Sequence, residues 1–281
     1  MANARKILKK IGGQKRNSAR RSSSRRRSRV MSRWKYIAIA ALTTVCTLAL
    51  LYRPVILPAF QRFVTCNGHK IYGACIPKGY SIYGIDVSHH QDRISWSRLK
   101  QGTQGEPPIS FAYMKATEGS SHCDTRFEEN WKSAKENGFI RGAYHYFSTE
   151  SSGAKQAQLF IGKVKLEPGD LPPMVDIEDE PENSAGFKRE LKIFIDTLEK
   201  HYKVKPIIYT YKKFHDKHIN DDIFAGYPLW IAQYNTKRPS IDREWILWQC
   251  TETGRLPGIR QKVDINIFNG TIEELQSLAI K

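Results

Sequence analysis

Short apolar runs rich in β-branched and aromatic residues recur along the chain from about residue 80 to its end. Between several of them, apolar residues repeat with helical spacing, as in Phe127, Trp131 and Ala134 or in the stripe from Phe187 to Tyr202. Nearly continuous apolar strands that alternate with helices predict parallel strands covered by helices. The eight predicted strands are Tyr83–Val87, Ile109–Lys115, Ile140–Phe147, Met174–Ile177, Pro206–Tyr209, Leu229–Ala232, Trp245–Trp248 and Val263–Ile267.

Eight such strands favour a closed barrel. The links that follow Tyr209, Ala232 and Trp248 have weak helical patterns, so the last three strands are expected to lack full crossover helices. We therefore predict an α/β fold in which residues 80–281 form an irregular, TIM-like (β/α)5(β)3 barrel. The final residues, 271–281, are expected to form a terminal helix with its N-cap near Thr271. No internal repeat and no second domain are evident.

An uncharged stretch of seventeen residues runs from Tyr36 to Tyr52. Its length is at the short end of the ~17–25 residues that cross a bilayer as a helix, and its aromatic flanks are typical of the two membrane interfaces. A core helix would show a polar face. A cleaved signal peptide would need a small-residue cleavage site, which Tyr52-Arg53-Pro54 lacks. We interpret residues 36–53 as a single retained transmembrane helix.

The net charge of +17 comes almost wholly from residues 1–35, which hold fourteen Lys or Arg and no acid, whereas residues 63–281 hold 29 basic and 28 acidic side chains. The positive-inside rule places this arm in the cytoplasm and everything after Arg53 in the periplasm or another extracytoplasmic space. Basic clusters also bind nucleic acid. The arm has no aromatic residue before Trp34 and no binding fold, so a topogenic segment near anionic lipid headgroups is favoured over nucleic-acid binding.

Residues 54–79 are predicted to connect the span to the barrel. Within them Cys66 and Cys75 bracket a stretch that begins with the turn-forming Asn67-Gly68, so they are candidates for a disulfide that closes a small hairpin loop in an oxidising compartment. No pair of cysteines has zinc-site spacing. Cys123 and Cys250 could be free thiols.

The most informative polar motif is Asp176-Ile177-Glu178, at the end of the fourth predicted strand. Residues i and i+2 share one face of a strand, so both carboxylates point the same way, with Cα atoms ~6.6 Å apart. Packing gives no reason to place two like charges there, because each disfavours ionisation of the other. The alternative is a solvated acidic loop, and the residues that follow, Asp179, Glu180 and Glu182, are interpreted as such loop charges.

Two further acids lie at the ends of predicted strands. Asp86 is in the first strand and Asp264 in the eighth, and these strands are neighbours in a closed barrel, so the two side chains should approach each other near the axis. The active site of such a barrel lies at the C-terminal ends of its strands. A lone acid in a strand is usually structural. Four of them, each costly to bury unless paired, point to a catalytic site instead. Glu118 is a weaker candidate.

An ordered set of motifs carries a resemblance to a known family. The motifs are Tyr83-Gly84-Ile85-Asp86-Val87-Ser88-His89-His90-Gln91, Phe111-Ala112-Tyr113-Met114-Lys115-Ala116-Thr117-Glu118-Gly119, Gly142-Ala143-Tyr144-His145-Tyr146-Phe147, Asp176-Ile177-Glu178 and Val263-Asp264-Ile265-Asn266. Over residues 80–281 the chain resembles the glycoside hydrolase family 25 lysozymes, which are N-acetylmuramidases of the Chalaropsis type. The resemblance implies an irregular barrel that cleaves the β-1,4 bond between N-acetylmuramic acid and N-acetylglucosamine in peptidoglycan.

The resemblance also implies roles for the acids. Glu178 would donate a proton to the leaving oxygen, which agrees with the expectation that its neighbour Asp176 raises its pKa and itself stays ionised. Asp176 would assist the substrate's own acetamido group, although direct nucleophilic attack or activation of water is also open. Asp86 and Asp264 would hydrogen-bond the sugar or set the protonation of the pair.

Residues on the third, sixth and seventh strands are candidates for substrate binding, since aromatic rings at a barrel mouth suit sugar faces, with core packing as the alternative. They are Tyr144, Tyr146, Trp230, Gln233, Tyr234, Trp248 and Gln249. Adjacent His89 and His90 should point to opposite faces of an extended chain, so no metal site is expected, nor any cofactor. The expected partners are peptidoglycan glycan strands and the membrane. Other functions left open are a catalytically silent barrel that binds wall glycans and a hydrolase of another acetamido-sugar polymer such as chitin.

Overall fold

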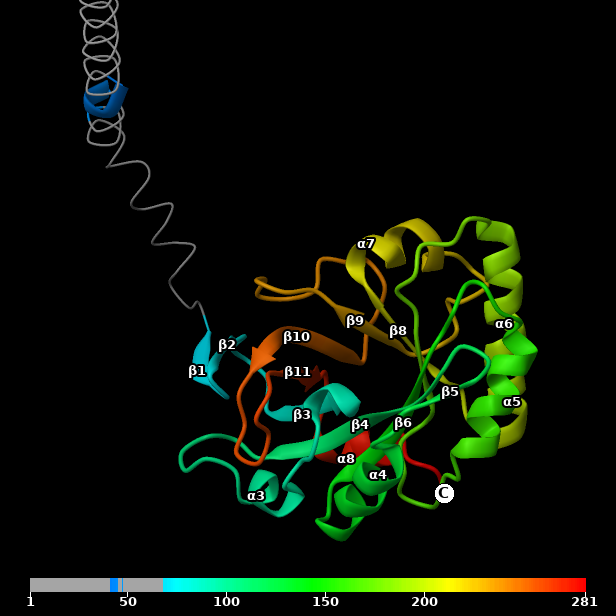
Figure 1. Ribbon diagram of the computed structural model, residues 1–281, viewed down its shortest axis with the longest axis horizontal. Helices are drawn as coiled ribbons and strands as arrows, with labels where there is room; N and C mark the ends of the chain where they lie inside the picture. The colour runs from blue at the N-terminus through cyan, green and yellow to red at the C-terminus, as the bar shows by residue number, and fades with distance from the viewer. Residues whose placement is uncertain (1–40, 45–46, 48–67) are drawn as a thin grey trace, which may run out of the picture. The chain divides into compact units, whose positions relative to one another are not determined.

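The computed structural model describes residues 41–44, 47 and 68–281 (Figure 1). The chain divides into two compact units, residues 1–65 and 66–281. In the first unit the described residues are helical, and Thr47 Oγ1 donates to the carbonyl oxygen of Thr43 at 2.7 Å. The arm and the rest of the predicted span, residues 36–53, lie outside the described residues. No helix within the described residues is both long and apolar enough to cross a bilayer.

The second unit is built on a closed barrel of eight strands. Around the barrel the order is β3-β11-β10-β9-β8-β7-β6-β4, and a β3–β4 pairing closes the ring. Each predicted strand is found with its bounds shifted by at most three residues, except that β10 ends six residues after its predicted end at Trp248. The strands are β3 (Ile82–Val87), β4 (Ile109–Glu118), β6 (Ile140–Tyr146), β7 (Met174–Asp176), β8 (Ile207–Tyr211), β9 (Leu229–Ala232), β10 (Leu247–Gly254) and β11 (Val263–Phe268). The short β5 (His122–Cys123) pairs with the end of β4.

Alternation along the strands sorts the side chains into two apolar clusters. In β4, Phe111 and Tyr113 belong to a cluster that fills the barrel, while Ala112 and Met114 belong to the cluster between barrel and helices. Gly142 in β6 makes room for this filling, since a Cβ atom there would lie 2.3 Å from the ring of Tyr113. The interior is therefore a packed core below the mouth of the barrel.

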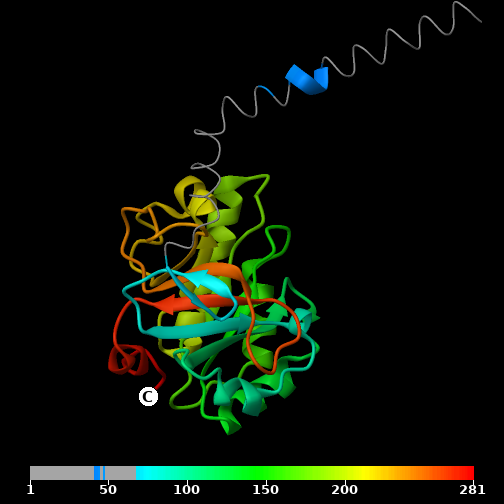
Figure 2. The same ribbon diagram turned by 90° about the vertical axis from the view of Figure 1, so that its left-hand side faces the viewer.

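The last strand runs against the others. All pairings from β3 through β4 and β6 to β10 are parallel, whereas β11 is antiparallel to both β10 and β3. Figure 2 shows β11 between these two strands. This corrects the expectation of parallel strands throughout. The short link from β10 forms a hairpin without a crossover helix, so the chain can only return in the opposite direction.

Helices cover the outside of the barrel. The predicted helices are confirmed as α4 (Phe127–Glu136), α6 (Ser184–Tyr202) and the terminal α8 (Ile272–Ser277), which has a capping box between Thr271 and Glu274. The structure adds α3 (Trp96–Gln101) and α5 (Gly153–Lys163). Between β8 and β11, all within the described residues, the only helical segments are one turn of helix, α7 (Lys212–Phe214), and a π-helical turn, η2 (His215–Ile219). The irregular last part of the barrel is thus as predicted.

A two-stranded hairpin precedes the barrel and packs on it. It consists of β1 (His69–Ile71) and β2 (Ala74–Ile76), joined at Tyr72 and Gly73, which both have positive φ. Tyr72 is fully buried, donates from its hydroxyl to the carbonyl of Pro107 at 2.8 Å, and accepts from the amide of Arg255 at 2.6 Å. The compact unit therefore starts at Cys66, ahead of the barrel boundary expected at residue 80.

The cysteines of this unit fall into two kinds. Cys75 is disulfide-bonded, and its predicted partner Cys66 lies outside the described residues, so that pairing stays a prediction. Cys123 and Cys250 are free. Burial raises the pKa of the Cys250 thiol to about 12, which leaves it unreactive near neutral pH.

The packing of Tyr72 predicts that the hairpin stabilises the whole unit. Because an aromatic side chain is removed from a core, Tyr72→Ala should lower the free energy of unfolding by about 3 kcal/mol. Tyr72→Phe, which keeps the ring and loses one hydrogen bond, should cost about 1 kcal/mol. Urea unfolding followed by tryptophan fluorescence measures both. Equal, negligible losses would show that the hairpin is not part of the cooperative unit.

Candidate active site

The four predicted acids meet at one end of the barrel. Asp86 is near the end of β3, Asp176 is the last residue of β7, and Glu178 follows two residues later. Asp264 is the second residue of β11, and because β11 is antiparallel, its beginning lies beside the ends of the other strands. Asp86 and Asp264 are direct partners in the β3–β11 register. Ile177 is buried in the outer cluster, so its neighbours Asp176 and Glu178 face the other way.

Asp86 is held by two side-chain amides. Its Oδ2 accepts from Asn266 Nδ2 at 2.7 Å and from Gln249 Nε2 at 3.1 Å. Burial raises the pKa of Asp86, and these hydrogen bonds together with one from Asp264 oppose the rise. The donors therefore favour a charged Asp86.

Asp264, the register partner of Asp86, is the acid that keeps a proton. Burial, followed by the charges of Asp86, Glu252 and Glu178, raises the pKa of Asp264 to about 9. The hydrogen bond between the two aspartates acts in opposite directions, lowering the pKa of Asp86 and raising that of Asp264. Protonated Asp264 thus donates to ionised Asp86, and the pair carries one charge.

This protonation makes stability depend on pH. A carboxyl whose pKa is raised by folding binds its proton more tightly in the folded state, so the free energy of unfolding should fall as pH rises from about 4 to about 9. Asp264→Asn is neutral at every pH and should be more stable than the parent at pH 8 by on the order of 2 kcal/mol, with little difference at pH 4. Thermal unfolding at both values measures this. The exposed Asp242→Asn is the control, and parallel pH curves for Asp264→Asn and the parent would contradict the assignment.

Asp176 and Glu178 form the second pair. Asp176 is 9% exposed and Glu178 is half-buried. Burial and the neighbouring charge of Glu178 raise the pKa of Asp176 well above its usual range. Burial and then the charge of Asp86 raise the pKa of Glu178, and its contact with the Tyr209 hydroxyl opposes that rise. The sequence predicted the raised pKa of Glu178 and an ionised Asp176. In the free protein, however, the deeper burial of Asp176 makes its charge the more costly one, so the pair shares a proton.

Asp176 also has an unused polar atom. Its Oδ1 is buried and has no hydrogen-bond partner among the described residues. A buried oxygen without a partner costs free energy. A donor from a molecule bound in the barrel mouth would relieve that cost.

An amide network links the acids across the barrel, and the sequence revealed only part of it. The hydroxyls of Tyr209 and Tyr234 donate to Gln249 Oε1 at 3.0 and 2.5 Å. Trp230 Nε1 donates to Asn266 Oδ1 at 3.2 Å. Of these, Asn266 and Tyr209 were not among the predicted site residues. Asn266 could have been found from its place two residues after Asp264, on the same face of the strand.

The predicted substrate-binding residues divide between the mouth and the core. Gln249 contacts Asp86 directly, and the exposed Tyr234 contacts Gln249. The half-buried Tyr146 is the register partner of Asp176. Tyr144 is buried beside Asp86 and Asp176, whose charges help raise its pKa. Gln233 exchanges hydrogen bonds with Ser240.

For the two tryptophans the structure supports the alternative of core packing. Trp230 is fully buried in the barrel filling, and Trp248 is fully buried in the outer cluster against Tyr80 and Trp245. Because side chains alternate along β10, Gln249 points toward Asp86 and its neighbour Trp248 points away. Both tryptophans pack rather than present a ring to a ligand.

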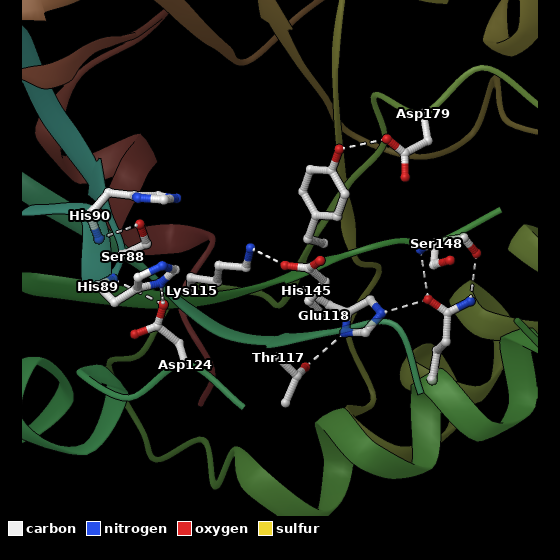
Figure 3. A network of polar contacts seen from close by, with 12 residues as sticks. Ser88, His89, His90, Lys115, Thr117, Glu118, Asp124, His145, Ser148 and Asp179 are labelled. Carbon is white, nitrogen blue, oxygen red and sulfur yellow. Dashed lines mark hydrogen bonds and ion pairs between the residues drawn. The ribbon is translucent and has the colours of Figure 1, made fainter. Parts of the chain in front are cut away.

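Three histidines lie at the rim next to β3. His89 and His90 are in a 3-10 helix, with ring centroids 4.1 Å apart, so the expected divergence of an extended chain is wrong. His89 Nδ1 lies 2.7 Å from Oδ2 of the buried Asp124 (Figure 3), and His122 is 6.4 Å away by ring centroids. Among the described residues no group of three or more His, Cys, Asp or Glu could hold a metal ion.

Comparisons with known proteins agree on one family. The family described as Glycosyl hydrolases family 25 matches residues 85–259. The chain is 40% identical over 210 residues to YegX of Escherichia coli (strain K12), covering 74% of this chain and 77% of YegX, and 34% identical over 214 residues to Lysozyme M1 of Streptomyces globisporus, covering 70% and 71%. The structure of a family 25 glycosyl hydrolase from Bacillus anthracis is similar with a TM-score of 0.66 at 36% identity, covering 71% of this chain and 94% of that one.

Proposed function

The chain belongs to glycosyl hydrolase family 25, and from this premise we propose that it is a lysozyme-type N-acetylmuramidase acting on peptidoglycan. The proposed reaction is hydrolysis of the β-1,4 bond between N-acetylmuramic acid and N-acetylglucosamine. The observation that carries the proposal is the pair of acids Asp176 and Glu178 at the barrel mouth, where burial raises the pKa of both and the buried Oδ1 of Asp176 has no hydrogen-bond partner among the described residues. The full set of four acids favours an enzyme over a barrel that only binds glycans.

In the proposed mechanism Glu178 is the proton donor. The acetamido carbonyl oxygen of the N-acetylmuramic acid attacks C1, the bond to the leaving oxygen breaks, and Glu178 protonates that oxygen. Glu178, now a carboxylate, takes a proton from a water molecule that attacks C1 and reopens the oxazolinium ring. Glu178 is thereby protonated again, and the cycle closes.

Asp176 would receive the acetamido N–H on its unpartnered Oδ1. This hydrogen bond favours the charged form of Asp176, which moves the shared proton of the pair to Glu178, where the reaction needs it. The carboxylate also stabilises the positive charge of the oxazolinium. The need for an acetamido donor supports this route over direct attack by Asp176.

Asp86 and Asp264 would support this pair. The charge on Asp86 raises the pKa of both Asp176 and Glu178 and so helps to retain their proton. Gln249 and Asn266 hold Asp86 in place. Protonated Asp264 keeps the charge near Asp86 to one, which limits the repulsion at the mouth.

Product analysis tests the proposed function. The full-length protein should release new reducing ends from purified peptidoglycan, and borohydride reduction should convert N-acetylmuramic acid, not N-acetylglucosamine, because the former is the reducing-end sugar after this cleavage. Chitin should be a poor substrate. Release of reducing ends from chitin at a comparable rate would show that another acetamido-sugar polymer is a substrate. Binding to peptidoglycan without any cleavage would establish a catalytically silent, glycan-binding barrel.

We further propose that residues 36–53 anchor the protein in a membrane, with residues 1–35 in the cytoplasm and the barrel in the periplasm or another extracytoplasmic space. The support is the uncharged stretch from Tyr36 to Tyr52 behind fourteen basic residues. A tag at the C-terminus should be cut by protease added to spheroplasts, while a tag at the N-terminus should be protected. Recovery of both tags in the soluble fraction would contradict an anchor.

A further inference from the structure

A chain of polar contacts ties the loop after β7 to β4 and β6. Lys115, only 8% exposed, places its Nζ 2.6 Å from Glu118 Oε2 and 4.8 Å from the ring centroid of Tyr146. The Tyr146 hydroxyl then donates to Asp179 Oδ1 at 2.8 Å. Figure 3 shows the contact between Lys115 and Glu118 and, toward the upper right, the hydrogen bond that Asp179 accepts. The contacts end on the residue that directly follows Glu178.

The same loop is held from two other directions. The backbone of Ile177 is bonded to β8, since its amide donates to Tyr209 O at 3.0 Å and its carbonyl accepts from Thr210 Oγ1 at 2.7 Å. Glu180 Oε2 accepts from Lys217 Nζ at 2.7 Å and lies 3.0 Å from His218 Nε2. Hydrogen bonds thus hold Ile177, the residue before Glu178. After Glu178, the first residue held by a side-chain hydrogen bond is Asp179, through Tyr146.

Packing does not explain this contact. Asp179 is exposed, so it contributes no apolar burial, and its charge repels the nearby acids. An anion beside a proton donor has two uses. It can fix the backbone through a directed hydrogen bond, and it can favour the protonated form of its neighbour.

We propose that Tyr146 and Asp179 are a positioning pair that holds the carboxyl of Glu178 at the glycosidic oxygen; the inference rests on the proposed function. Tyr146, predicted as a substrate-binding residue, then acts through Asp179 rather than through its ring. Asp179, interpreted from the sequence as a loop charge, becomes part of the machinery. Lys115, which is paired with Glu118, contacts the face of the Tyr146 ring.

Charged and titratable groups face Glu178 from several elements. Asp179 and Asp86 raise its pKa, and Lys115 lowers it. Loss of the Asp179 charge should therefore lower the pKa of Glu178. The groups that face it are Asp86 from β3, Lys115 from β4, Tyr146 from β6, Asp176 from β7, Tyr209 and Tyr211 from β8, Tyr234 after β9, Asp264 from β11 and Asp179 from its own loop.

A double-mutant cycle on the full-length protein tests the pair. Tyr146→Phe keeps the ring and removes the hydroxyl, and Asp179→Ala removes the acceptor. Each should lower kcat for release of reducing ends by about 10- to 100-fold with KM changed less than about twofold, because the substrate is bound but the proton donor is misplaced. The double variant should be no slower than the slower single variant.

Two further variants separate positioning from stability. Asp179→Asn retains an oxygen for Tyr146 but loses the charge, so it should keep most of kcat while the alkaline limb of the pH profile moves to lower pH. Tyr227→Phe is the matched control, because the Tyr227 hydroxyl also bonds carboxylates, those of Asp196 and Glu199, and two lysines approach its ring, but it lies ahead of β9 at the opposite end of the barrel. It should leave kcat unchanged.

The outcomes distinguish this inference from the function on which it rests. Losses that add in the double variant, or a rise in KM at constant kcat in Tyr146→Phe, would overturn the positioning pair and return Tyr146 to substrate binding. In both cases the parent protein still cleaves peptidoglycan. A parent protein that cleaves no glycan contradicts the proposed function itself.

Discussion

Replacement of Glu178 by glutamine should reduce the release of reducing ends from peptidoglycan by about 10³-fold or more. The amide keeps the size and polarity of the side chain but has no proton to give to the leaving oxygen, and loss of a general acid typically costs about 10²- to 10⁴-fold. The rate of the parent protein should fall as pH rises through the raised pKa of Glu178, since the acid must be protonated to act.

The control for this variant lies in the same acidic run. Glu182→Gln makes the same chemical change at an exposed position four residues later and should retain full activity. Thermal unfolding should show that both variants fold as the parent does. An unchanged rate in Glu178→Gln would remove Glu178 from the mechanism and with it the assignment of the site.

The second large effect is expected at Asp176, and it depends on the substrate. Asp176→Asn should lower kcat by about 10²- to 10³-fold, because a neutral amide cannot stabilise the positive charge that develops on the acetamido group. Peptidoglycan in which the muramic acid amino groups have been deacetylated should resist the parent protein to a similar degree. Reducing-end assays on both polymers measure the two effects.

These two measurements together separate the mechanisms. If Asp176 attacked C1 itself, deacetylated peptidoglycan would still be cleaved and a glycosyl-enzyme would form on Asp176, detectable by mass spectrometry of the denatured protein. If Asp176 assists the acetamido group, neither is expected. Cleavage of the deacetylated polymer by the parent protein at an undiminished rate would refute the acetamido route.

Local patterns in the sequence were sufficient for the main elements of the fold. All eight strands and the helices α4, α6 and α8 were predicted, because period-2 and period-3.6 patterns depend on residues only a few positions apart. The short α3 and the helix α5 were not predicted. In α5 the first residue is a glycine whose missing side chain lets it approach α6, since a Cβ atom on Gly153 would lie 1.9 Å from the carbonyl oxygen of Glu190. Such a contact has no signature in the helix itself.

The start of the folded unit shows a related difference. The sequence predicts a connector over residues 54–79, because the hairpin strands of three residues are too short to give an apolar pattern. The stability of the hairpin comes instead from Tyr72, which reaches Pro107 and Arg255 across gaps in the sequence that no local pattern covers. Local patterns also left open whether Trp230 and Trp248 pack in the core, because their neighbours come from distant parts of the sequence.

By itself, the sequence determined the barrel, the four acids and the shared face of Asp176 and Glu178, since spacing along a strand decides which way neighbouring side chains point. Only the tertiary structure decided the antiparallel direction of β11, the amide network on Asp86 and the hydrogen bond between Tyr146 and Asp179. Gln249 and Asn266 reach Asp86 over 163 and 180 residues of sequence. The protonation of each acid depends on burial and on charges brought together from different strands, and these are set only when the barrel closes.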